Sequence, residues 1–262
     1  MTHTSVAGTF VEAASPSAVP AVERHSIGKS VLLHLLPGLL ALAVFSLLAR
    51  PVEGLGFPSA MPWLITVLGI LLPFELGYML YQGRKGNGKF SLNAVIAYRR
   101  PLRAPQVILW AAVTFAAVLV LFVLSGPVTA YLQTQVFTWV PGWFAFDTGI
   151  EGGGYARSAL LLLNVASVFV FVIGVPIVEE MYFRGFLLPR ISYLGMWAIL
   201  FNALLFALYH FTTPWVFVTR ALITLPLAYV AYRNQNIIPG IVVHMIANSV
   251  DVVMGFLYVL GM

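Results

Sequence analysis

The sequence predicts an all-α membrane protein, a polytopic bundle of about seven to eight transmembrane helices. Hydrophobic residues make up 60% of the 262 residues and charged residues only 9%. The mean hydropathy is +0.93, far outside the range of soluble domains. Apolar segments of bilayer-spanning length recur along most of the chain. Since no hydrophilic stretch is long enough to fold separately, we expect a single helical bundle over residues 31–262.

The N-terminal part of the chain differs from the rest in composition. Residues 1–30 are rich in Ala, Ser, Val and Pro with little periodicity, which predicts a disordered tail rather than a secretory signal. Apolar segments follow at 31–49, 63–82 and 106–125. Between the second and third segments lie six cations, and the positive-inside rule therefore predicts a cytoplasmic N-terminus. These cations are Arg84, Lys85, Lys89, Arg99, Arg100 and Arg103.

The second half of the chain carries four more apolar segments, at 158–178, 195–211, 217–233 and 237–259. The loop 126–157 before them is rich in aromatic residues, which predicts an interfacial piece and room for an eighth, short helix. The fourth segment continues as MYFRGFLLPR, which is compatible with a helix until Pro189. We therefore extend this helix to about Arg190. Glu179 then lies roughly 16 Å from that helix end and His210 roughly 22 Å along the next helix, so the two can meet.

Composition also excludes several classes of function. The chain has no cysteine, which rules out disulfides, a thiol nucleophile and thiolate metal ligands. The formal net charge of +5 comes from cations that cluster between apolar segments. We assign these cations to membrane topology and anionic lipid headgroups, not to nucleic acid. The expected location is a prokaryotic cytoplasmic membrane, as a multi-pass integral protein.

An acidic doublet at the end of an apolar run is the first candidate site. On a helix, Glu180 and Arg184 are four residues apart and face one another, whereas Glu179 points about 100° away. Arg184 would hold Glu180 ionised and leave Glu179 free to act as a general base. The alternative is an ion cluster at the membrane interface without a catalytic role.

Further polar residues follow inside apolar runs. His210 ends the stretch FALYH, and His244 and Asn248 lie one helical turn apart, with Asp251 on nearly the same stripe. Such groups are costly in a bilayer and must face the bundle interior. Structural hydrogen bonds between helices are the alternative for each of them. For Glu75, a lone carboxylate in the second helix, a hydrogen bond to a neighbouring helix is favoured over a place at a substrate entrance.

In combination, the motifs EEMYFR, FALYH and HMIAN resemble those of the CPBP family of intramembrane proteases, which includes type II CAAX prenyl endopeptidases and bacteriocin-processing proteins. The resemblance implies a protease core at about 158–259 with its active site inside the bundle. It implies that Glu179 activates water, that Glu180 and Arg184 support it, and that His210 orients the water. His244 and Asn248 would complete the site as metal ligands or as donors to the oxyanion.

The resemblance implies hydrolysis of a peptide bond in a membrane-associated, prenylated or bacteriocin-type substrate. Whether a divalent metal such as zinc takes part stays open: Glu179, His210 and His244 are its candidate ligands, yet no HExxH motif occurs. A metal-free route is equally consistent with these residues. The functional alternatives are a non-catalytic scaffold or immunity protein of the same fold and, less favoured, a proton-coupled transporter. Substrate identity and oligomeric state stay open.

Overall fold

The computed structural model describes residues 22–141 and 154–261, and in these ranges the chain is helical with no strand beyond one isolated bridge between Arg99 and Asn236. Within these described ranges, six helices are long and apolar enough to cross a membrane, so the protein is a multi-pass integral membrane protein. Their bounds are Ile27–Gly54 (α1), Ala60–Asn87 (α2, η1 and α3), Ala104–Val136 (α4 and η3), Arg157–Arg190 (α5 to α7), Pro214–Asn234 (η7 and α9) and Ile238–Leu260 (α10). A shorter apolar helix, α8, covers Trp197–Tyr209.

The second and fourth spans are continuous although their local geometry changes along them. The second span consists of α2 (Ala60–Thr66), a π-helical turn η1 (Val67–Leu71) and α3 (Leu72–Asn87). The fourth consists of α5 (Arg157–Ser167), η4 (Val168–Gly174), α6 (Val175–Glu179), η5 (Glu180–Leu187) and α7 (Leu188–Arg190). The predicted extension of the fourth helix to Arg190 is confirmed, and the acidic doublet therefore lies within this span and not at its end.

The fifth predicted span, 195–211, is wrong in length. The helix there has 13 residues, and at 1.5 Å per residue it measures roughly 20 Å, too short to cross the hydrocarbon core. Pro214 restricts the conformation of Thr213 and so prevents the helix from continuing into α9, Phe217–Asn234. His210 consequently sits where α8 ends and the chain turns back.

Other boundaries differ less. The first helix begins at Ile27 and not at residue 31, because the Ser26 hydroxyl accepts a hydrogen bond from the Lys29 amide at 3.2 Å and caps it. Helix α4 (Ala104–Tyr131) and η3 (Leu132–Val136) extend into the loop that was expected from residue 126. Residues 142–153, which include three of the loop's aromatic residues, and residues 1–21 of the predicted tail lie outside the described part.

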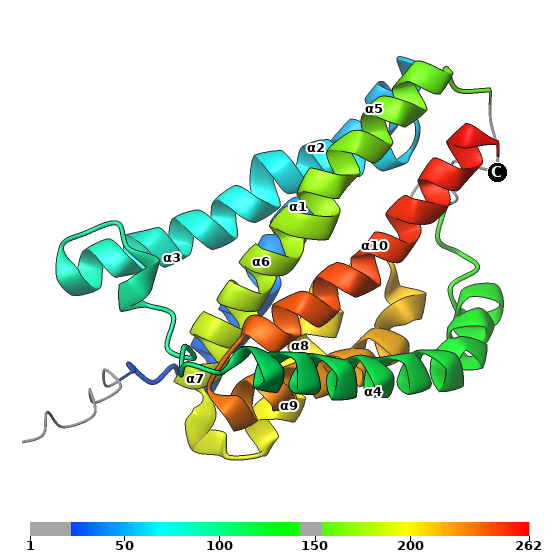
Figure 1. The fold of residues 1–262 in the computed structure, drawn as a ribbon. Coiled ribbons are helices and arrows are strands. Elements are labelled where there is room, and N and C mark those ends of the chain that lie inside the picture. The colour runs from blue at the N-terminus through cyan, green and yellow to red at the C-terminus, as the bar shows by residue number, and fades with distance from the viewer. Residues whose placement is uncertain (1–21, 142–153, 262) are drawn as a thin grey trace, which may run out of the picture.

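The fourth span runs through the middle of the molecule, and α10 lies alongside it (Figure 1). Helix α8 packs against α1 and α9, while α4 covers α9 and α10 from outside. Much of α4 is exposed and apolar, as is expected of a helix facing lipid. The elements that carry the candidate site residues are therefore the central ones.

One end of the bundle gathers most of the cations. There the His25 amide donates to the Arg190 carbonyl at 3.0 Å, and the Arg100 amide donates to the Gln235 carbonyl at 2.8 Å. The segment before α1, the loop between α3 and α4, the end of α7 and the turn before α10 thus meet on one side. These segments carry the cations from which the charge pattern predicts the cytoplasmic side.

Candidate active site

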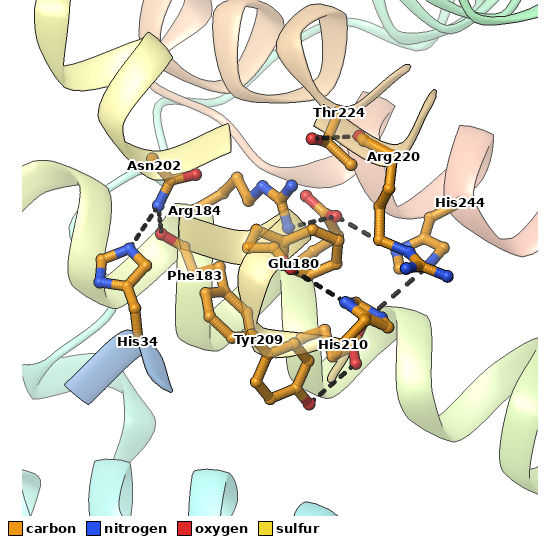
Figure 2. Close-up of polar contacts among 12 residues, drawn as sticks. His34, Glu180, Phe183, Arg184, Asn202, Tyr209, His210, Arg220, Thr224 and His244 are labelled. Carbon is orange, nitrogen blue, oxygen red and sulfur yellow. Dashed lines mark hydrogen bonds and ion pairs between the residues drawn. The ribbon is translucent and has the colours of Figure 1, made fainter. Parts of the chain in front are cut away.

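The acidic doublet lies where the fourth span changes from α- to π-helical geometry. Glu179 is the last residue of α6, and Glu180 is the first residue of the π-helical segment η5. Such segments in helices occur frequently at functional sites. The widened turn is held from outside: the Asn202 side chain of α8 donates to the Phe183 carbonyl at 3.0 Å, and also contacts His34 Nε2 at 3.0 Å (Figure 2).

Glu180 forms a buried charge cluster with two partners. Its Oε1 atom lies 3.2 Å from Arg184 Nη1 and 3.2 Å from His244 Nδ1 (Figure 2). The Glu180 and Arg184 side chains have no exposed surface. The predicted contact between these two residues is therefore confirmed, and the same carboxylate joins the fourth span to α10.

Phe206 connects this cluster to His210. The Arg184 guanidinium lies 4.0 Å from the centroid of the Phe206 ring, a distance typical of a cation–π contact. The same ring makes edge-on contacts with both imidazoles, with centroids 4.9 Å from His210 and 6.4 Å from His244. The Phe of the FALYH motif thus serves as the surface on which the arginine and both imidazoles pack.

Glu180 contacts the Nδ1 atom of the His244 ring, and Glu179 faces the opposite nitrogen, Nε2. The Glu179 Oε2 atom is 3.9 Å from His244 Nε2, too long for a direct hydrogen bond and suited to one bridging water. Its Oε1 atom accepts a hydrogen bond from the Tyr209 hydroxyl at 3.1 Å. Glu179 therefore has one oxygen held by the protein and one oxygen facing an imidazole nitrogen.

The hydrogen bonds of both histidines determine which ring nitrogen is free. His210 Nδ1 lies 2.9 Å from the Phe206 carbonyl, and because a carbonyl only accepts, Nδ1 carries the proton. His244 Nδ1 likewise donates to the Glu180 carboxylate. Each imidazole therefore leaves its Nε2 atom available for a water molecule or a substrate.

Asn248 and Asp251 lie further along α10. The Asn248 amide nitrogen donates to the Phe171 carbonyl of η4 at 2.9 Å, so one of its two N–H groups remains for a substrate. Asp251 is exposed and makes no hydrogen bond or ion pair with the described residues. Asp251 therefore shares a helix stripe with His244 and Asn248 without a hydrogen bond to either.

The residues proposed as metal ligands do not fit a metal site. In the described part of the chain, no three His, Asp or Glu side chains gather in an arrangement that could hold a metal ion. We therefore derive no catalytic step through a metal.

Two further residues, Tyr209 and Arg220, reach the site. The sequence motifs did not assign a function to either of them. Tyr209 lies in the FALYH motif directly before His210. Its position next to this histidine is the only feature of the sequence that indicated a place at the site. Arg220 of α9 lies close enough to Glu179 and His210 for charge interaction. Its Nη1 atom is buried without a hydrogen-bond partner among the described residues.

Fold and site together define a multi-pass, all-α membrane protein in which a carboxylate pair and two histidines meet inside the bundle. Residues 161–250 match the family described as Type II CAAX prenyl endopeptidase Rce1-like. The chain thus carries an Rce1-like domain of the CPBP family over this range, as its motifs indicated. No curated protein and no solved structure matches the chain.

Proposed function

We propose that the protein is an intramembrane endopeptidase in which Glu179 and the two histidines activate a water molecule. The arrangement of Glu179 carries this proposal: one oxygen is fixed by Tyr209, and the other faces His244 Nε2 at 3.9 Å. A water between these two groups would be oriented by both of them. Membership of the matched domain in a peptidase family supports a peptide bond as the target.

The proposed reaction uses only groups of this chain. Water attacks the carbonyl carbon of the scissile bond while its proton passes to the Glu179 carboxylate, which gives a tetrahedral oxyanion. The free N–H group of Asn248 and the charge of Arg220 are the proposed stabilisers of that oxyanion. The proton then passes from Glu179 to the amide nitrogen as the C–N bond breaks, releasing an amine and a carboxylic acid.

Glu180 and Arg184 have a supporting role in this proposal. Glu180 holds the Nδ1–H group of His244, which keeps the Nε2 lone pair directed to the water. Arg184 offsets the charge of Glu180 inside the bundle. For the substrate we propose a membrane-associated peptide of the prenylated or bacteriocin type, since the matched family is named for prenyl substrates.

Substitution at Glu179 tests the proposal most directly. Glu179→Gln preserves shape but removes the base, and we expect a loss in kcat of about 10²- to 10⁴-fold on a membrane peptide library. His210→Ala should have a comparable effect. Asp251→Asn is the matched control, because this exposed acid has no partner in the described structure. Undiminished processing by both Glu179→Gln and His210→Ala would favour the non-catalytic scaffold instead.

A further inference from the structure

Glu75 is a third carboxyl group at the site, contributed by a helix outside the matched domain. It lies in the first turn of α3, and its side chain is completely buried. Its Oε1 atom lies 2.8 Å from the Tyr209 hydroxyl oxygen, within hydrogen-bond distance. The sequence favoured a hydrogen bond to a neighbouring helix for Glu75, and the structure has one. Its partner also contacts Glu179.

The Tyr209 hydroxyl oxygen lies within hydrogen-bond distance of two carboxyl groups, at 2.8 Å from Glu75 and 3.1 Å from Glu179. A tyrosine hydroxyl has one proton and can donate one hydrogen bond, although its oxygen can also accept. An ionised carboxylate only accepts. Two hydrogen bonds among these three groups therefore require two protons, so one of the two carboxyl groups must be protonated.

The surroundings of the two carboxyl groups differ. Glu179 faces His244, whereas the Oε2 atom of Glu75 has no hydrogen-bond partner among the described residues. The charged or titratable groups that act on Glu75 are Glu179 and Arg184 of the fourth span and Tyr209 of α8. Arg184 is already paired with Glu180. Because an unpaired buried carboxylate is strongly disfavoured, the second proton belongs on Glu75.

We propose that Glu75 is the protonated member of a Glu75–Tyr209–Glu179 chain that holds the general base in place. Glu75 donates to the Tyr209 oxygen, and the Tyr209 hydroxyl donates to Glu179 Oε1. This leaves Glu179 ionised with Oε2 directed to the water. The inference rests on the proposed function of Glu179, and in it Glu75 is a positioning residue, since it acts through Tyr209.

Infrared spectroscopy of the purified protein tests the protonation state without any substrate. A protonated carboxylic acid has a carbonyl band that is resolved from the bands of a carboxylate. We expect this band to disappear in Glu75→Gln and to remain in Glu179→Gln. Asp251→Asn identifies any contribution of that acid. The proposal is overturned if the band is lost in Glu179→Gln alone, or if it remains in both glutamate variants.

Kinetics then tests whether the chain positions Glu179. The side-chain amide of Gln can donate to Tyr209 as a protonated Glu does, so Glu75→Gln should keep kcat within about threefold of the wild type. Glu75→Leu fills the space without a donor, and we expect kcat to fall about tenfold or more with KM unchanged. An equal loss in both variants would refute the positioning role. If the wild type cleaves no peptide, the proposed function fails while the infrared result still decides the protonation of Glu75.

Discussion

Arg184 Nη1 lies 3.2 Å from Glu180 Oε1, with both side chains completely buried in the fourth span. Removing one member of such a pair leaves an uncompensated charge, which typically costs about 3–5 kcal/mol. We therefore expect Arg184→Met to lower the stability of the protein by this amount, measured as thermal unfolding in detergent. The double variant Glu180→Gln with Arg184→Met should recover much of the loss, since it removes both charges.

The double variant also separates charge from packing. Arg184 additionally packs on the Phe206 ring, and Met fills similar space there. If the single and double variants unfold at the same temperature, the loss comes from packing and the charge argument is refuted.

This contact also shows what the sequence could predict. The spacing of Glu180 and Arg184 follows a local rule for residues four apart, so their pairing was predictable. The contact of Glu180 with His244 joins residues 64 positions apart and was not predicted, because the motif resemblance assigned both residues to one site without pairing them. The bridge from Glu75 through Tyr209 could not be predicted, because it depends on how α3 and α8 are placed against the fourth span.

Local backbone geometry was equally beyond the sequence pattern. Hydropathy gives the same signal for an α-helix and a π-helical segment. The change from α- to π-helical geometry at Glu180 therefore could not be predicted from the hydropathy pattern. The same limitation explains the fifth apolar segment, where hydropathy extended the helix past Tyr209. The turn that ends it depends on Pro214 and on packing against neighbouring helices.

Gly240 provides the space that Glu180 occupies beside α10. A Cβ atom at this position would lie 3.0 Å from Glu180 Oε2, so Gly240→Ala must displace the carboxylate. We expect activity to fall about 10- to 100-fold, because small displacements in a catalytic group have effects of this size. The free energy of unfolding should change little, because the preference of a helix for Ala over Gly, about 0.5–1 kcal/mol, offsets the cost of the displacement.

Gly126→Ala in α4 is the matched control for this substitution. A Cβ atom at Gly126 meets no atom of the described structure within 4 Å. Peptidase assays and thermal unfolding of both variants should therefore show an activity loss only for Gly240→Ala. Full activity in Gly240→Ala would mean that the exact position of Glu180 is unimportant for His244 and the site.

The Nη1 atom of Arg220 is buried without a hydrogen-bond partner among the described residues. A buried donor without a hydrogen bond typically costs about 1–3 kcal/mol, so Arg220→Met should raise stability by up to about this amount. The same variant should lose peptidase activity, because a positive charge close to Glu179 and His210 is removed. Thermal unfolding and peptide cleavage measure the two effects.

Arg100→Met serves as the control, since this exposed arginine lies in the loop before α4. Arg100→Met should alter neither the stability nor the peptidase activity by much. A destabilised Arg220→Met variant would indicate that the guanidinium has a structural partner, and unchanged activity would remove Arg220 from the proposed site.

The segment before α1 should respond to acid through His25. The ring of His25 is buried against Phe186, and its Nδ1 atom has no partner among the described residues. Burial, together with the positive charges of Lys29 and Arg190, lowers the pKa of His25 to about 4. The unfolded segment would bind a proton near the ordinary value of about 6.5. Docking is therefore strongest above that pH and weakens as the pH falls towards 4.

A single introduced cysteine can report this change, since the chain has none of its own. A fluorophore on Val22→Cys should show a transition as the pH is lowered from about 6.5 to 4. His25→Phe keeps an aromatic ring against Phe186 and removes the titrating group, so the transition should vanish in that background. Glu23 pairs with Lys29 at 3.0 Å, and this contact lowers the pKa of the Glu23 carboxyl group below its ordinary value. A transition of unchanged midpoint in His25→Phe would assign the response to another group and refute this account.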